Sequence, residues 1–245
     1  MLKYVNTTQF SPIPCVFLKM LLGIRKKFNN FLFFLHLPFA IFAMIMSFWD
    51  SDILKMKFDQ PLPNAGDLLL AEPLMSDTAF QRSVIVLVEH GDHLGSMGFV
   101  TNRCSNYNLN EIVEGIECEE EIPVYIGGPV HRDRLYYLHT LGKLIPESIE
   151  VAKGLYVSGD FDTIIEYVNS GSPIKGHIRF FLGYSGWEKN QLEQELRNFD
   201  WAVKGLTDVA RLLTLDEEEA WRSEVSELDS RYLLWLNCPS STLLN

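Results

Sequence analysis

The stretch Phe180–Leu196, FFLGYSGWEKNQLEQEL, joins an apolar run to a Gly-Tyr-Ser-Gly segment and then to a pattern rich in Glu and Gln. This order predicts a strand, a tight turn over 183–186 and a helix opened by Trp187. The two glycines permit positive φ or a close backbone approach. We expect Ser185 or Gly186 to cap the helix.

A serine between two glycines raises the question of a nucleophile. The nucleophile elbow of hydrolases requires G-x-S-x-G between a strand and a helix. Gly183 and Ser185 fit, but Trp187 stands where the last glycine is required. In that fold the histidine follows the serine, whereas all six histidines of this chain precede Ser185. A hydrolase of this type is poorly supported, a triad in another chain order stays open, and no catalytic residue is assigned.

The residues after the turn allow two interpretations. Trp187, Gln191 and Glu195 recur every four residues, a spacing that predicts one shared helix face. A Trp beside a Gln and a Glu, beneath exposed turn amides, is compatible with a ligand pocket. It is also compatible with an indole packed over the helix with polar residues on its rim, and this structural interpretation is favoured.

The rest of the body alternates short apolar runs with turn signals. Strands are predicted at 68–70, 83–89, 96–101, 123–126, 135–140, 155–158, 177–182 and 201–204. Helical patterns are predicted at 109–115, 161–169, 188–197 and over most of 206–236. Because 83–101 is a predicted hairpin, a wholly parallel sheet is disfavoured. We expect an α+β fold with a mixed, strongly curved sheet and helices packed around it.

The charge is unevenly distributed along the 245 residues, whose net charge is -11. Residues 1–57 contain seven Lys or Arg and two acids, which leaves 14 basic and 30 acidic residues in 58–245, a net charge of -16. Such a body repels phosphate backbones unless basic residues cluster on one face, and the sequence contains no such cluster. We therefore expect a protein partner and consider direct nucleic-acid binding unlikely.

No cofactor and no metal site are predicted. The four cysteines, at 15, 104, 118 and 238, form no Cys-x-x-Cys pair and no zinc spacing with histidine. Four reduced thiols in a reducing compartment are the simpler interpretation. The run Glu89-His90-Gly-Asp92-His93 lies in a predicted hairpin turn, where too few ligands converge to favour a metal site.

We expect residues 1–57 to be an N-terminal extension, separate from a single domain over 58–245. Phe31–Trp49 has nineteen residues without a formal charge, and three basic residues precede it. This pattern is typical of a membrane anchor or an uncleaved signal sequence. Alternatively, translation starts at Met44 or Met46, which removes the run. We favour the later start and a cytoplasmic protein, with a membrane anchor through 31–49 as the alternative.

Four motifs have a family's order and spacing. They are PLMSDTAFQRSV at Pro73–Val84, GSMGFVTN at Gly95–Asn102, GGPV at Gly127–Val130, and the GYSGW-x-x-x-QL-x-x-EL pattern at Gly183–Leu196. With these motifs the chain resembles the YqgE/AlgH family of small bacterial proteins over residues 60–205. The family often has a proline soon after the asparagine, where this chain has Arg-Cys.

The resemblance implies a soluble, cytosolic α+β protein with a bifurcated, barrel-like sheet. It implies no established activity, since the family is largely uncharacterised and carries only a provisional label of transcriptional regulator. The resemblance therefore predicts the fold of this chain better than its function. We expect a non-enzymatic regulatory or interaction protein that acts through a protein partner. The alternatives are a module that binds a small anionic ligand, or an enzyme of unassigned reaction that uses Arg82 and His139.

Twelve residues are candidates for a ligand site: Arg82, Asn102, Gly127, Gly128, His139, Gly183, Tyr184, Ser185, Gly186, Trp187, Gln191 and Glu195. Arg82 either binds an anion or pairs with a local acid such as Asp77. The adjacent glycines at 127 and 128 either form an anion-binding nest or simply make a turn. His139 is either a base or a hydrogen-bonded core residue, and Asn102 is expected to bond backbone. We hypothesise that Arg82, Asn102, His139 and the 183–187 segment converge at one sheet edge.

Overall fold

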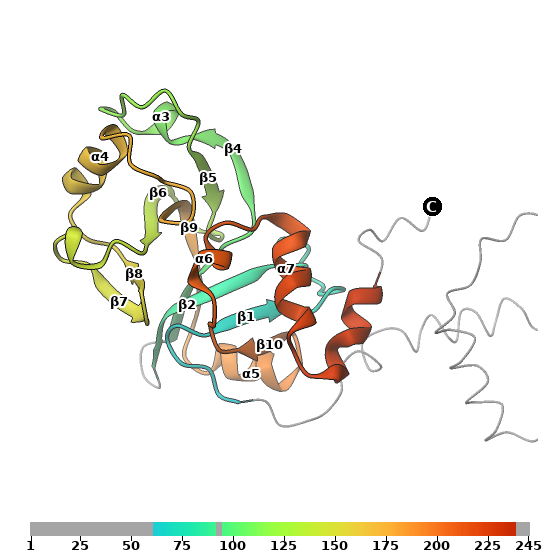
Figure 1. The fold of residues 1–245 in the computed structure, drawn as a ribbon. Helices are drawn as coiled ribbons and strands as arrows, with labels where there is room; N and C mark the ends of the chain where they lie inside the picture. Colours follow the sequence, from blue (N-terminus) through green and yellow to red (C-terminus); the bar gives the residue numbers. More distant parts are fainter. Residues whose placement is uncertain (1–60, 92–94, 239–245) are drawn as a thin grey trace, which may run out of the picture. The chain divides into compact units, whose positions relative to one another are not determined.

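The computed structural model describes residues 61–91 and 95–238, which all belong to one unit, Asp52–Asn245 (Figure 1). The apolar run Phe31–Trp49 and the alternative start sites lie outside these residues. Within the described part, no helix combines the length and the apolar character that crossing a bilayer requires.

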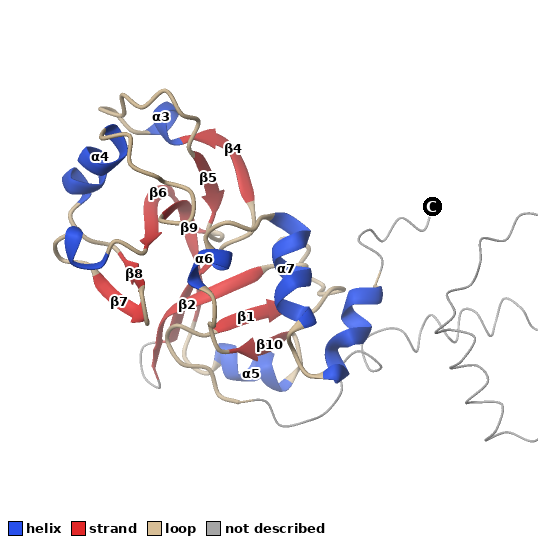
Figure 2. Ribbon diagram, viewed as in Figure 1, coloured by secondary structure: helices blue, strands red, loops and turns tan. Residues whose placement is uncertain are grey.

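The described strands form one branched sheet (Figure 2). Its strands are β1 Leu68–Ala71, β2 Val84–Gly91, β3 Gly95–Val100, β4 Cys104–Asn108, β5 Pro123–Ile126, β6 Val130–His139, β7 Ile149–Ala152, β8 Leu155–Val157, β9 Ile178–Trp187 and β10 Trp201–Lys204. The main path runs β10-β1-β2-β3-β9-β6-β8-β7. Strand β9 also pairs in parallel with β5, which pairs with β4, so the sheet branches at β9.

This architecture confirms the α+β class, because a large, mainly antiparallel sheet is combined with helices. The hairpin of β2 and β3 is also confirmed. The main path is open, with β10 at one end and β7 at the other, and no described pairing joins these two strands. The barrel-like curvature expected from the resemblance is therefore not confirmed.

The helices among the described residues are short. They are α3 Leu109–Ile112, α4 Phe161–Asn169, α5 Gln191–Arg197, α6 Val209–Leu212 and α7 Glu217–Ser226, with 3-10 turns η2 Gly142–Leu144 and η3 Ser230–Asn237. The predicted helix at 161–169 is confirmed with its cap, since the Asp160 carboxylate accepts the Thr163 N–H at 2.8 Å. Gly171, just beyond its end, has φ 72°.

Alternate residues of β1 and β2 enter two different cores, as the period of a strand requires. Leu68 and Leu70 pack under α7 and η3, where the rings of Trp221 and Trp235 are stacked at 6.4 Å. Leu69 packs on the opposite face, beneath α5. A third core lies between the branch strands, α3 and α4.

The opening stretch corrects one prediction. Residues 183–187 are not a turn, because β9 continues through Trp187 and its last three residues pair with β3. Helix α5 begins only at Gln191, after Asn190 with φ 64°, so neither Ser185 nor Gly186 caps it. Pairing across the sheet satisfies the backbone groups of this glycine-rich segment, and this outweighs its local preference for a turn.

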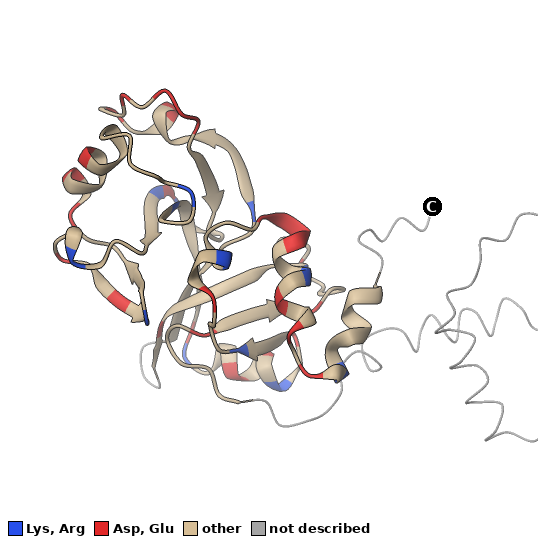
Figure 3. Cartoon of the chain, in the orientation of Figure 1, with Lys and Arg blue, Asp and Glu red and all other residues tan. Residues whose placement is uncertain are grey.

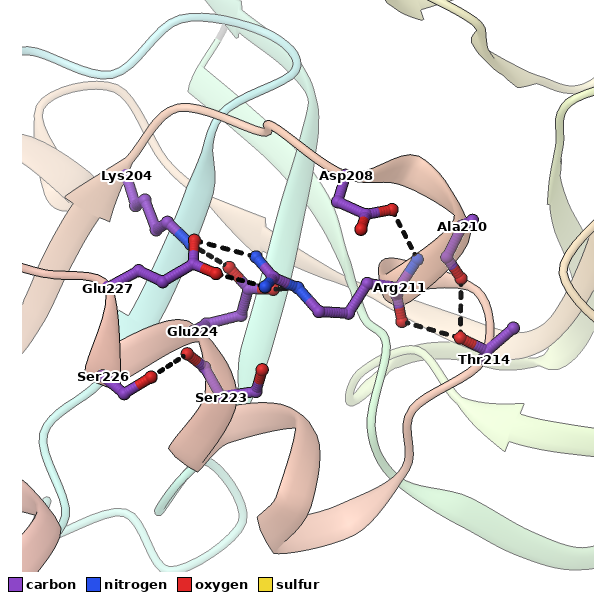
Figure 4. Close-up of polar contacts among 9 residues, drawn as sticks. All are labelled: Lys204, Asp208, Ala210, Arg211, Thr214, Ser223, Glu224, Ser226 and Glu227. Atoms are coloured by element: carbon purple, nitrogen blue, oxygen red, sulfur yellow. Dashed lines mark hydrogen bonds and ion pairs between the residues drawn. The ribbon is translucent and has the colours of Figure 1, made fainter.

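Salt bridges attach the C-terminal helices to the sheet (Figure 4). Lys204 of β10 pairs with Glu224 of α7 and with Glu227, the residue that follows this helix, and Arg211 of α6 pairs with the same two carboxylates. Glu224 is buried, so its charge depends on these two partners. This network joins three elements that are separate in sequence.

Candidate functional site

A polar pocket of about 430 Å³ opens where β2 begins and β3 ends, beside the first turn of α7. Its lining is entirely polar, charged or thiol-bearing: Thr78, Gln81, Arg82, Asn102, Arg103, Cys104, Glu217 and Glu218. Two of the predicted ligand residues, Arg82 and Asn102, are therefore brought together. Its volume is within the range of about 300–1,000 Å³ typical of small-molecule sites.

Asn102 is a structural brace at the base of this pocket. Its Oδ1 accepts the Val84 N–H at 2.9 Å, and its Nδ2 donates to the carbonyls of Arg82 at 3.0 Å and Glu217 at 2.7 Å. The expectation that it bonds backbone agrees with these contacts. Since its amide is used by the protein and 1% of the residue is exposed, it has little capacity left for a ligand.

Arg82 is also engaged by the protein. Its Nη1 forms an ion pair with Glu218 at 3.0 Å, and its Nη2 donates to the Cys238 carbonyl at 2.7 Å. The guanidinium lies over the Trp221 ring, 4.9 Å from its centroid. The partner proposed from sequence, Asp77, is instead used by the local turn, where its carboxylate accepts the Ala79 N–H. Arg82 therefore attaches α7 to the start of β2.

Six of the eight lining residues were not predicted from the sequence, and Arg103 and Glu217 are the two of them that carry a charge without an ion pair among the described residues. Arg103 donates from Nη2 to the Gln81 carbonyl, and its buried Nε has no partner among the described residues. Burial lowers the pKa of Arg103, and the negative charge of Glu217 opposes that shift. The described residues contain no ion pair between the two side chains and no hydrogen bond to the Glu217 carboxylate. One indication for Arg103 was present in the sequence: it follows Asn102 at a position near which the family often has a proline.

The glycines at 127 and 128 have a packing role. A Cβ on Gly127 would come within 2.3 Å of the Gly183 carbonyl oxygen, and one on Gly128 within 2.2 Å of the Tyr184 carbonyl carbon. These glycines therefore let two backbones cross closely. Ser185 is buried and its Oγ donates to the Gly127 carbonyl at 3.1 Å, so this hydroxyl is not presented as a nucleophile.

Tyr184 and Gly186 lie on the opposite side of β9 from Ser185. The Tyr184 ring packs edge-on against Tyr136, with centroids 5.8 Å apart. A Cβ on Gly186 would meet the Tyr184 ring at 3.2 Å, so the tyrosine lies along the exposed glycine. Tyr184 is half-buried against the core, Gly186 is exposed, and neither residue lines the polar pocket.

Trp187 contacts the polar residues of α5 as expected, although it belongs to the strand and not to the helix. The indole N–H groups of Trp187 and Trp201 both donate to Glu195 Oε2 at 2.8 Å. Gln191 Nε2 donates to the other oxygen of Glu195 at 2.9 Å. Three donors thus converge on one carboxylate, an arrangement that supports the structural interpretation of an indole packed against the helix.

His139 is fully buried in β6. Its Nε2 lies 3.0 Å from the Ser158 carbonyl, its Nδ1 accepts the Leu141 N–H at 3.3 Å, and its ring stacks on Tyr156. Donation to a carbonyl and acceptance from an amide define the neutral tautomer. Burial lowers the pKa of His139, and the bond to the Ser158 carbonyl partly opposes this. The contacts fit the core-residue interpretation.

The hypothesis of a single convergent site is wrong. The register pairs Trp187 with Ser96, and Ser96 with His90, at the far end of β2 from Arg82. His90 lies six positions after Val84 along β2, which corresponds to about 20 Å at about 3.3 Å per residue. The polar pocket includes Arg82 and Asn102 but neither His139 nor the 183–187 segment.

Besides the polar pocket, the structure contains a second cluster of charged residues that was not predicted from the sequence. Arg179 in β9 is buried, pairs with Asp216 at 2.9 Å and lies 4.1 Å from the centroid of the Tyr125 ring. The Tyr125 hydroxyl donates to Asp216 at 2.7 Å, and burial is the main cause of its raised pKa. The signal was an arginine inside the apolar run HIRFFLG. The cluster fixes the segment before α7 to the branch point of the sheet.

Among residues 61–91 and 95–238, no group of three or more His, Cys, Asp or Glu side chains is arranged to hold a metal ion. In the same residues, the three cysteines at 104, 118 and 238 are free thiols. The pKa of Cys104 is raised, mainly by burial and then by Asp216. This shift reduces its thiolate character at neutral pH.

Fold and pocket together define a small α+β protein with a branched sheet and a polar pocket braced by an asparagine. The chain belongs to the AlgH-like family, whose model matches residues 68–233. The resemblance drawn from the motifs is thereby confirmed.

Several bacterial relatives are similar over most of their length. A UPF0301 protein of Bacteroides thetaiotaomicron is 41% identical over 196 residues, which cover 80% of this chain and 98% of that protein. A UPF0301 protein of Chlorobium limicola is 36% identical over 189 residues, covering 77% of this chain and 98% of that protein. These names state no activity.

Two solved structures share the fold. The solution structure of the AlgH protein from Pseudomonas aeruginosa has a TM-score of 0.56 and 32% identity, covering 76% of this chain and 99% of that one. A crystal structure of a Corynebacterium diphtheriae protein has a TM-score of 0.57, covers 73% of this chain and 94% of that one, and at 20% identity supports the fold alone.

Proposed function

We propose that this protein is a non-enzymatic interaction protein that recognises a basic surface of a partner protein. The side chains considered for catalysis are dispersed: His139 is sealed in β6, Ser185 bonds a backbone carbonyl, and Arg82 is paired with Glu218. An enzyme that uses Arg82 and His139 together therefore has no support from the geometry. The regulatory role is proposed to operate through the partner.

The observation that carries the proposal is an acidic loop with exposed apolar residues, defined as residues 107–122, which run from the end of β4 through α3 to the start of β5. Six glutamates of this loop are exposed: Glu111, Glu114, Glu117, Glu119, Glu120 and Glu121. No Lys, Arg or His occurs between residues 104 and 130. Tyr107 is 53% exposed and Ile112 is 38% exposed beside these acids. Figure 3 shows the acidic positions around α3.

The acidic loop is held in place from both ends and in its middle. Leu109 and Ile122 are buried in the core beneath it. The Asn169 side chain of α4 donates to the Gly115 carbonyl at 2.8 Å and accepts the Glu117 N–H at 2.9 Å. A preformed surface loses less conformational entropy on binding. Exposed apolar side chains with a charged rim are the arrangement found at protein interfaces.

The negative charge of the acidic loop favours a partner protein with a basic surface. Six carboxylates attract Lys and Arg on a facing protein and repel nucleic-acid phosphates. A role in transcription would then proceed through protein contact. We place the activity in the domain 58–245 and in the cytoplasm, an assignment supported by the free thiols of the described cysteines.

The test is affinity capture from cells of the source organism with the full chain and two variants. Tyr107→Ser with Ile112→Ser removes the exposed apolar residues of the loop, and Leu144→Ser alters a residue that is 58% exposed elsewhere on the surface. We expect a defined partner that is lost with the double variant, retained with Leu144→Ser, and weakened by added salt. Capture that is equal for the double variant and the wild type would overturn the proposal.

A module for a small anionic ligand is the second candidate, since Arg82 and Arg103 line a pocket. Glu217 and Glu218 line the same pocket, so its formal charges cancel. Two carboxylates at the site disfavour a ligand that carries only negative charge. The geometry therefore supports this candidate less than the protein-interaction proposal.

A further inference from the structure

The polar pocket has a composition that points to a ligand of a different kind from the anion expected from sequence. Small-molecule sites are mostly apolar with a few polar groups. This pocket has no aliphatic or aromatic side chain in its lining. A ligand in this pocket would therefore form hydrogen bonds and ion pairs with the lining residues. Such a lining favours a small, hydrophilic ligand.

The protein's own pairing leaves one charge of each sign for that ligand. Glu218 forms ion pairs with Arg82 at 3.0 Å and with Arg222 at 3.6 Å, and Asn102 bonds backbone through its whole amide. Arg103 and Glu217 remain, and among the described residues no ion pair within 4.0 Å links either to an opposite charge. A positive and a negative group thus line the pocket without a direct ion pair between them, although the charge of Glu217 still acts on the pKa of Arg103.

Two residues of the pocket also have an unusual backbone conformation. Arg82 has φ 54° and Glu217 has φ 48°, so two non-glycine residues with left-handed backbone line one pocket. Such conformations are costly and are often found at functional sites. Both are held by the Asn102 side chain, which bonds the carbonyl of each. This bracing fixes the Cα positions from which the pocket side chains extend.

We propose that this pocket binds a small zwitterion of the α-amino acid type, with its carboxylate on the Arg103 guanidinium and its ammonium on the Glu217 carboxylate. An amino acid carries one charge of each sign a few bonds apart, and Arg103 and Glu217 offer one charge of each sign in the lining of the same pocket. A charge-assisted hydrogen bond at each end provides recognition. The remaining polar lining at Thr78 and Gln81 faces the ligand's side chain.

This site is separate from the acidic loop, so it adds a ligand to the proposed interaction protein and does not depend on it. The pocket is formed jointly by the sheet and the first turn of α7. A ligand that bridges Arg103 and Glu217 would therefore stabilise the docking of α7 on the sheet.

The test uses the purified full chain and each of the twenty α-amino acids separately, with binding followed by isothermal titration and by the shift in melting temperature. Propionate and propylamine are the single-charge controls. We expect at least one amino acid to bind, and both controls to bind at least tenfold more weakly. Binding of none at 10 mM, or equal binding of a single-charge control, would overturn the proposal.

Variants decide whether the binding occurs in this pocket. Glu217→Gln should weaken binding at least tenfold, whereas Glu219→Gln, on the same turn of α7 but outside the lining, should leave it unchanged. Arg103→Gln should abolish binding. If that variant does not fold, Arg103→Lys, which keeps the charge but loses the forked donor geometry, should weaken it. Equal effects of the two glutamate variants would place the ligand elsewhere and sink the assignment.

Discussion

Asn102 bonds both backbone groups of Glu217, a residue 115 positions later in the chain. The Glu217 N–H donates to the Asn102 carbonyl at 2.9 Å, and the Asn102 side chain donates to the Glu217 carbonyl at 2.7 Å. The end of β3 thereby holds the start of α7 in a left-handed conformation. The polar pocket exists because these two residues are joined.

The first prediction concerns this brace. Asn102→Ala leaves the Val84 N–H and the carbonyls of Arg82 and Glu217 without their partner. Each buried unsatisfied group costs about 1–3 kcal/mol, so we expect the free energy of unfolding to fall by about 3 kcal/mol or more. Urea denaturation measures it. Asn106→Ala, at an exposed position of β4, is the control and should change stability by less than about 0.5 kcal/mol. A similar small change for Asn102→Ala would show that the brace is dispensable.

The second prediction concerns the carboxylate shared by two indoles. Glu195→Leu removes the acceptor of the Trp187 and Trp201 N–H groups, both of which are buried. We expect the free energy of unfolding to fall by about 2–4 kcal/mol. Gln194→Leu, at an exposed position of the same helix, is the matched control. A stable Glu195→Leu variant would mean that the indoles find other acceptors.

The third prediction follows from the lowered pKa of His139. The unfolded chain takes up a proton near the ordinary pKa of about 6.5, whereas the buried neutral ring resists it. The contribution to stability is therefore complete above about pH 6.5 and declines as the pH falls below that value. Unfolding free energies from pH 8 to pH 5 should show this slope, and His139→Asn should reduce it. NMR titration of the ring with a midpoint above 6.5 would contradict the assignment.

The fourth prediction concerns the salt bridges of α7. Hydrogen bonds from Arg211 and then Lys204 lower the pKa of Glu227 to about 2. A lowered carboxylate pKa contributes stability that is present above the ordinary value of 4.5 and is lost as the pH falls toward 2. Glu227→Gln should therefore flatten the loss of stability in this range, measured by urea denaturation. Glu114→Gln, at an exposed position with no such partner in the described part of the chain, should retain the wild-type acid response. Identical curves for Glu227→Gln and wild type would refute the role of the network.

The fifth prediction concerns nucleic acid. The body 58–245 carries a net charge of -16, so on balance it repels a phosphate backbone. Fluorescence polarisation with mixed genomic DNA fragments should detect no binding, at low salt or at physiological salt. Binding that survives physiological salt would reveal a basic face and would make direct DNA contact part of the function.

Much of the fold was predictable from local patterns. The strands at 123–126 and 201–204 have the observed bounds, and the helix at 161–169 begins after its predicted Asp160 cap. Each of these elements carries a local signal in the sequence, either a short apolar run or a capping residue at the start of a helix. The sequence did not predict the bulged strand β4 or the exposed strand β7, because neither contains the run of apolar residues from which a buried strand is predicted.

The candidate site was predictable only in part. The motifs indicated the family, and the types of residue suggested polar chemistry, but they did not show which side chains meet. Arg82 lies beside Asn102 and far from the 183–187 segment because the register of β2, β3 and β9 separates them. Arg103 and Glu217 come together only because α7 returns to the end of β3. Such contacts are between residues distant in sequence, and no local pattern records them.

By itself, the sequence determined the α+β class, the acidic character of the body and the family, since periodicity, charge and motif spacing are properties of the chain. Tertiary structure alone decided that Gly183–Trp187 is a strand, that Asn102 braces Glu217, and that a polar pocket forms between the sheet and α7. The reason is physical: a backbone group accepts whichever partner the fold brings within about 3 Å, and that partner can come from any part of the chain.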